Sequence, residues 1–142
     1  MKLRVLVIDD DAAICNLLQT ALSGQGYEVS TLADPSEFPF INKEACTCPA
    51  DRPCADIIIA DIVMPKVDGV DFFKHLKDTG CFTLNRGNVA IMSGYLTIHY
   101  MNVLNNLGIH YFRKPFEMQE IYTWVDECRE RIEAQGSTTT AQ

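Results

Sequence analysis

The chain has 142 residues, of which 47% are hydrophobic and 22% charged, and its formal net charge at pH 7 is −7. These values are typical of one globular domain with a single core. The acidic balance argues against a nucleic-acid-binding surface, and no apolar run approaches the roughly 20 residues of a membrane span. The N-terminus has no cleavable signal pattern, so we expect a cytoplasmic protein in which the six cysteines are thiols or metal ligands.

The first predicted strand ends in three consecutive carboxylates. The β-rich run Leu3–Ile8 is followed by Asp9, Asp10 and Asp11. Adjacent carboxylates repel one another, so in a compact domain they indicate a nearby cation. For Asp11 we favour the simpler role of capping the helix that follows. Cys15 lies within that helix and is interpreted as a small buried apolar residue.

A second carboxylate follows the central predicted strand. The uncharged run Ile57–Ala60 is typical of a strand that is covered on both faces of a parallel sheet. The run stops at Asp61, and ligands of open α/β sheets bind outside the carboxyl ends of the strands. Met64 and Pro65 then turn the chain, and Asp68–Gly69 opens an amphipathic segment.

The remaining elements repeat the alternation of strand and helix. Three further strands are predicted, at Tyr27–Leu32, Asn88–Met92 and Ile109–Phe112. The second of these ends at Ser93, and the third is soon followed by Lys114. A last helix is predicted over about residues 117–133, which closes a domain of residues 1–133. Residues 134–142 are small and polar, so we expect a disordered tail.

Strand and helix alternate five times, which is the pattern of an α/β fold with a doubly wound parallel sheet. In such a sheet the carboxyl ends of the strands lie at one edge. We therefore expect the functional groups that follow four of the strands to converge, although they are scattered in the sequence. They are Asp9 with Asp10, Asp61, Ser93 and Lys114. The predicted site contains three carboxylates, a hydroxyl and an ammonium group.

Four ordered segments of the chain resemble those of receiver domains of two-component response regulators, of the stand-alone CheY-like type. The segments are Val7–Asp11, Asp61–Gly69 with its Met-Pro and Asp-Gly pairs, Met92–Gly94 and Tyr111–Phe116. The resemblance covers nearly the whole chain. It implies a five-stranded, flavodoxin-like sheet in the order 2-1-3-4-5.

The resemblance also implies a chemistry. Asp61 would be the nucleophile that accepts a phosphoryl group from a sensor histidine kinase, a phosphotransfer protein or a small phosphodonor. The carboxylates of Asp9, Asp10 and Asp61, with the main-chain oxygen of Val63, would hold Mg²⁺, which prefers oxygen ligands. Beyond its own phosphorylation and dephosphorylation, no conventional enzyme activity is expected.

Two further residues would complete the site and transmit its state. Lys114 would supply a compact positive charge to the phosphoryl group, and Ser93 its hydroxyl. The Lys114–Pro115 bond is a candidate cis peptide. By the same resemblance, Ser93 and Tyr111 would move together and change the surface of the fourth helix, fifth strand and fifth helix. That surface would act on an unknown downstream protein, without direct contact to nucleic acid or membrane, from a monomer or a weak homodimer.

The segment 33–55 departs from the receiver pattern. Four prolines interrupt it, so a Cys- and Pro-rich loop is expected to replace or shorten the usual second helix. It contains Cys46, Cys48 and Cys54, and Cys81 follows the third helix. These thiols could hold a structural Zn²⁺ or an iron–sulfur cluster. Reversible disulfide formation and unrelated free thiols are the other readings.

Two other functions compete with the receiver interpretation. Asp9–Asp11 superficially resembles the D-x-D pattern of haloacid-dehalogenase-type phosphatases, which also form an aspartyl phosphate. Ala13 stands where those enzymes usually carry Thr or Val, no cap insertion follows, and the motifs around Asp61 would be left unexplained. The second alternative is a receiver-fold module that senses redox state or metal without being phosphorylated. The complete set of acids, hydroxyl and lysine argues against it.

Overall fold

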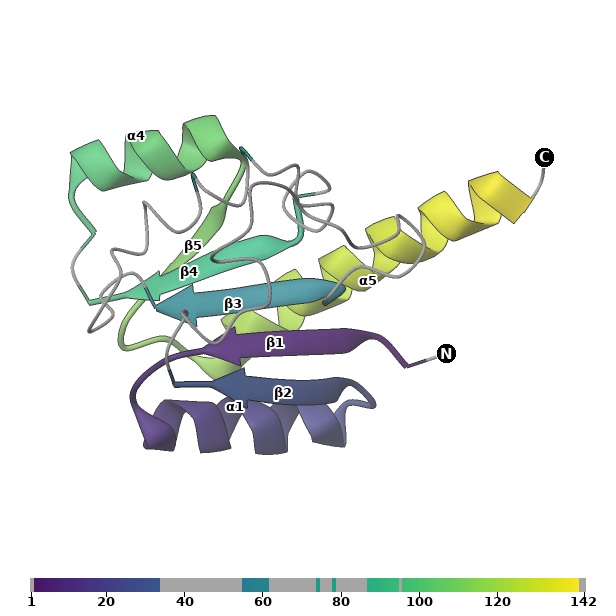
Figure 1. Cartoon of the computed structure of the whole chain (residues 1–142), viewed down its shortest axis with the longest axis horizontal. Coiled ribbons are helices and arrows are strands. Elements are labelled where there is room, and N and C mark those ends of the chain that lie inside the picture. Colours follow the sequence, from purple (N-terminus) through teal and green to yellow (C-terminus); the bar gives the residue numbers. More distant parts are fainter. Residues whose placement is uncertain are drawn as a thin grey trace.

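The computed structural model describes residues 2–33, 55–61, 74, 78, 87–94 and 96–140, with side chains up to residue 134. Figure 1 shows the arrangement of its elements. They are β1 (Arg4–Ile8), α1 (Ala12–Gly24), β2 (Glu28–Leu32), β3 (Ile57–Asp61), β4 (Val89–Ser93), α4 (Ile98–Leu107), β5 (His110–Arg113) and α5 (Met118–Thr140). Within the described part of the chain, no helix combines the length and apolarity that crossing a membrane requires.

The strands form one parallel sheet in the order β2-β1-β3-β4-β5 (Figure 1). This order confirms the predicted doubly wound, flavodoxin-like fold. The helices α1 and α5 pack on one face of the sheet and α4 packs on the other. In the β3–β4 register, Asp61 lies beside Met92, so the carboxyl ends of these neighbouring strands are level.

The burial of β3 on both faces explains why its sequence has no alternation of polar and apolar residues. Ile57, Ile58 and Ile59 are each fully buried. Ile58 packs with the core cluster beneath α4, whereas Ile57 and Ile59 pack with the cluster beneath α1 and α5. Successive side chains of a strand point to opposite faces, so a strand that is covered on both faces needs apolar residues at every position.

Three helix ends are set by local residues. Asp11 has extended backbone angles, and its carboxylate accepts a hydrogen bond of 2.9 Å from the Ala13 amide. This contact confirms the predicted cap of α1. Helix α4 begins after Thr97, whose side chain accepts from the Tyr100 amide, and ends at Gly108 with a φ of 75°. That left-handed conformation favours glycine.

The last helix is longer than predicted. It was expected over about residues 117–133, whereas α5 spans Met118–Thr140 and extends past the sheet (Figure 1). The disorder expected for residues 134–142 stays a prediction. Small polar composition indicated a tail. However, a helix that is already nucleated gains one backbone hydrogen bond for each residue added, and no proline interrupts this stretch. The Cys- and Pro-rich segment 33–55 lies outside the described residues apart from its two ends.

Side-chain hydrogen bonds fasten α5 to the rest of the domain. The Tyr27 hydroxyl donates to Asp126 Oδ1 at 2.9 Å. Farther along the helix, the Arg131 guanidinium donates to the side-chain oxygen of the buried Asn88 at 3.0 and 3.3 Å. The same group donates to the Gly87 carbonyl at 3.1 Å. These contacts join the helix to the ends of strands that lie far away in the sequence.

The Tyr27 hydroxyl gives a testable pH dependence. Burial, together with the neighbouring Asp126, raises the pKa of Tyr27 to about 12, against about 10 for an unperturbed tyrosine. The folded state therefore keeps this proton when the unfolded chain has lost it, and stability should fall as the pH rises from about 10 towards 12. Tyr27→Phe should remove that part of the decline. Near neutral pH the variant should have a free energy of unfolding about 1 kcal/mol lower, because it lacks the hydrogen bond to Asp126.

Urea unfolding measured near neutral pH and at high pH tests this expectation. Tyr122→Phe is the matched control, because Tyr122 lies on α5 and packs against the same core cluster. If both variants showed the same dependence on alkaline pH, the hydrogen bond between Tyr27 and Asp126 would not be its source.

Candidate functional site

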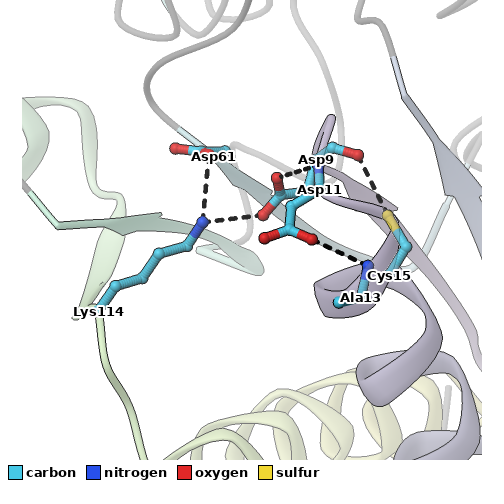
Figure 2. Close-up of polar contacts among 6 residues, drawn as sticks. All are labelled: Asp9, Asp11, Ala13, Cys15, Asp61 and Lys114. Atoms are coloured by element: carbon cyan, nitrogen blue, oxygen red, sulfur yellow. Dashed lines mark hydrogen bonds and ion pairs between the residues drawn. The ribbon is translucent and has the colours of Figure 1, made fainter.

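The predicted residues converge at the carboxyl ends of the strands. The ammonium group of Lys114, which follows β5, lies 3.0 Å from Asp9 Oδ2 and 3.2 Å from Asp61 Oδ2 (Figure 2). The side chain of Asp9 is fully buried, whereas those of Asp61 and Lys114 are 13% and 23% exposed. One lysine thus bridges two carboxylates at the mouth of the site.

The charge of Lys114 is stabilised by its partners. Burial by itself lowers the pKa of Lys114, but the hydrogen bonds and negative charges of Asp9 and Asp61 together outweigh that effect. The pKa is therefore raised above its ordinary value. The lysine remains protonated at neutral pH, and it offsets the repulsion between the two carboxylates.

Asp9 is held through each of its polar atoms. Its amide donates to the Leu32 carbonyl at 3.0 Å, and its Oδ1 accepts from the Asp11 amide at 2.9 Å. Its Oδ2 accepts from Lys114. Its carbonyl oxygen accepts from the Cys15 thiol, with the sulfur 3.2 Å away (Figure 2). A buried carboxylate with this many partners has little freedom to move.

Cys15 is the site neighbour that sequence reasoning missed. It was predicted as an apolar residue, and it does pack in the core with the other buried residues of α1. Its sulfur nevertheless contacts the polar end of β1. Burial, followed by the negative charge of Asp9, raises the pKa of the Cys15 thiol, which therefore keeps its hydrogen at neutral pH. Helical spacing showed which face the residue lies on, but it held no signal for this contact.

Three carboxylates form a cluster that could hold a cation. Asp9, Asp10 and Asp61 each place an oxygen atom within 4.8 Å of the others. Asp9 is buried and Asp10 is exposed, so the cluster reaches from the core to solvent. Hard cations such as Mg²⁺ prefer oxygen ligands and keep several waters. This donor set fits that chemistry.

The other predicted residues lie at the same edge or outside the described ranges. Ser93 is buried at the end of β4, and its carbonyl accepts a hydrogen bond of 2.8 Å from the Lys114 amide. Tyr111 is partly buried on β5 and packs against the α4 side of the core. The Lys114–Pro115 peptide is cis, as predicted. The predicted ligands Val63, Cys46, Cys48, Cys54 and Cys81 lie outside the described residues.

Comparison with known proteins decides the family. A family model described as the response regulator receiver domain matches residues 5–126. The chain belongs to this family. The four motif resemblances and the parallel sheet order are thereby explained together, and the phosphatase alternative is set aside. Receiver domains are the phosphoacceptor modules of two-component signalling, so this chain is a signalling domain of that kind.

Individual relatives agree with this assignment. The chain is 24% identical over 119 residues to the transcriptional regulatory protein TrcR of Mycobacterium tuberculosis, which covers 84% of this chain and 42% of TrcR. It is 37% identical over 81 residues to the response regulator MprA of Mycolicibacterium vanbaalenii, covering 56% of this chain and 31% of MprA. The chain therefore spans less than half the length of these curated relatives.

A solved structure supports the fold independently. The CheY-like receiver domain protein of Methanospirillum hungatei superposes with a TM-score of 0.73 at 24% identity. The match covers 94% of this chain and 99% of that protein. At 24% identity, this similarity supports the receiver fold and nothing more specific.

Proposed function

We propose that this receiver domain, within residues 1–133, accepts a phosphoryl group on Asp61 in the cytoplasm. The donor would be a sensor histidine kinase, a phosphotransfer protein or a small phosphodonor. The observation that carries the proposal is the position of the Lys114 ammonium between the carboxylates of Asp9 and Asp61, 3.0 and 3.2 Å away. A nucleophile beside a fixed positive charge, at the open edge of the sheet, suits an incoming phosphoryl group.

The transfer itself requires little covalent help from the protein. A carboxylate oxygen of Asp61 forms a bond to phosphorus, while the bond from phosphorus to the donor breaks and the leaving group keeps its electron pair. Catalysis of such a transfer rests on positioning and on neutralising charge. Because the Lys114 ammonium contacts Asp61, it would stabilise the oxygens of a phosphoryl group carried by that residue.

The acidic cluster would hold Mg²⁺. Asp9, Asp10 and Asp61 would supply carboxylate oxygens, and the main-chain oxygen of Val63, which lies outside the described residues, would complete the ligand set. When bound, the ion would neutralise negative charge on the phosphoryl oxygens. The zinc or iron–sulfur site expected at Cys46, Cys48, Cys54 and Cys81 lies outside the described residues, and the proposed phosphorylation does not depend on it.

The output of the domain would be a change of surface. Ser93 ends β4 beside the site, and Tyr111 lies on the neighbouring strand β5. Attraction of Ser93 to the phosphoryl group, with inward movement of Tyr111, would favour a second arrangement of α4, β5 and α5. Ile98, the first residue of α4, is 74% exposed, so its apolar side chain would be available to a downstream protein. The domain would act there as a monomer or a weak homodimer.

Phosphorylation by a small donor tests the function directly. The purified chain should gain one phosphoryl group when it is incubated with acetyl phosphate and Mg²⁺, as measured by intact-protein mass spectrometry. Hydroxylamine should remove the group, because it cleaves acyl phosphates, and chelation of Mg²⁺ beforehand should prevent labelling. A chain that gains no label under these conditions, or a label that resists hydroxylamine, would contradict the proposal.

A further inference from the structure

We infer that Cys15 is a positioning residue, whose thiol holds the peptide between Asp9 and Asp10 in the geometry that the cation site needs. The inference rests on the proposed function, because it concerns the affinity of that same site. It assigns a role to a residue that helical spacing alone would leave as core packing.

The contact joins two elements across a tight turn. The Cys15 sulfur lies 3.2 Å from the carbonyl oxygen of Asp9, six residues earlier in the chain. Cys15 is 8% exposed and Asp9 is 1% exposed. The thiol therefore reaches from the first turns of α1 to the end of β1, where little water competes for the carbonyl (Figure 2).

The carbonyl that Cys15 contacts is mechanically linked to two of the three carboxylates. It belongs to the planar peptide that connects Asp9 to Asp10. Rotation of this peptide would move the backbone of Asp10, and it would also move the Asp11 amide that donates to Asp9 Oδ1. A donor on this oxygen consequently restrains the positions of both acidic side chains.

Packing by itself does not account for the contact. Leu18 and Leu22 lie on the same face of α1 and are fully buried, so they provide the apolar anchor of the helix. The Cys15 side chain adds a polar atom that is directed at the carbonyl (Figure 2). An alanine would keep a small apolar side chain but would remove the donor, and a serine would keep a donor.

Calorimetric titration of the full chain with Mg²⁺ under reducing conditions tests the inference. Cys15→Ala should raise the dissociation constant for Mg²⁺ about three- to tenfold, the size expected for one lost hydrogen bond. Cys15→Ser should return it to within about twofold of the unaltered protein. Cys128→Ala is the matched control, because Cys128 is also a buried thiol but lies on α5 beside Arg131. The Cys128→Ala variant should bind Mg²⁺ with the affinity of the unaltered protein.

The outcomes separate this inference from the proposed function. An unchanged Mg²⁺ affinity in Cys15→Ala, no recovery in Cys15→Ser, or an equal loss in Cys128→Ala would each overturn the positioning role. Each of these results would leave the proposed phosphorylation of Asp61 standing, because that proposal does not depend on Cys15. If the unaltered protein bound no Mg²⁺ and gained no label from acetyl phosphate, both the inference and the proposed function would fail.

Discussion

Replacing Asp61 with asparagine should abolish phosphoryl incorporation. Asparagine matches the shape of aspartate, so β3 and its buried isoleucines should be undisturbed. It lacks the anionic oxygen that must attack phosphorus, and a neutral amide is a poor nucleophile. We expect the labelling rate with acetyl phosphate and Mg²⁺ to fall by at least about three orders of magnitude.

The control for this variant is a carboxylate outside the cluster. Asp78 is exposed and is not a member of the acidic group at the sheet edge, so Asp78→Asn should be labelled at the unaltered rate. Intact-protein mass spectrometry over time compares the three proteins. Equal labelling of Asp61→Asn and the unaltered chain would show that another residue is the nucleophile.

Replacing Lys114 with methionine should impair both stability and phosphorylation. The variant keeps most of the side-chain volume but leaves the fully buried Asp9 carboxylate without its cation, 3.0 Å away. Removing one partner of a buried ion pair destabilises by about 3 kcal/mol or more. Because the phosphoryl group would also lose a fixed positive charge, we expect transfer to slow by about 100-fold.

Divalent cations should distinguish this electrostatic effect from a packing defect. In Lys114→Met the three carboxylates of the cluster repel one another, so millimolar Mg²⁺ should restore much of the lost stability by binding to the folded state. Urea unfolding with chelator and with Mg²⁺ measures this recovery. Lys2→Met, which removes an exposed lysine, should be unaffected in both conditions. A loss of stability in Lys114→Met that Mg²⁺ did not reduce would argue against the proposed charge balance.

Local patterns in the sequence determined much of the fold and the site. The run Ile57–Ala60 is apolar at every position, so both faces of a strand formed by it must be covered. It therefore predicted a central strand of a parallel sheet. The cap at Asp11 could be predicted because it depends only on neighbouring residues. Asp61 was identified in the same way, since a carboxylate directly after a buried strand lies at the edge where ligands bind. The strand order itself rested on the resemblance to receiver domains, because hydrophobic periodicity does not specify which strands pair.

The contacts that give the site its electrostatic character needed the tertiary structure. Lys114 lies 105 residues from Asp9 and 53 residues from Asp61 in the chain, and only the packed sheet brings the three together. Cys15 carried no signal of its contact with Asp9, because helical periodicity reports the face of a residue but not the atoms that its side chain meets. The length of α5 was underestimated for a related reason. Amino-acid composition indicates only the average preference of a segment for helix, whereas an existing helix extends because each added residue continues the hydrogen bonding of the preceding turn. The amino-acid sequence therefore specified which carboxylates, hydroxyl and ammonium group the site can contain. The distances between these groups, which set their charge states and their affinity for a cation, were decided by long-range packing.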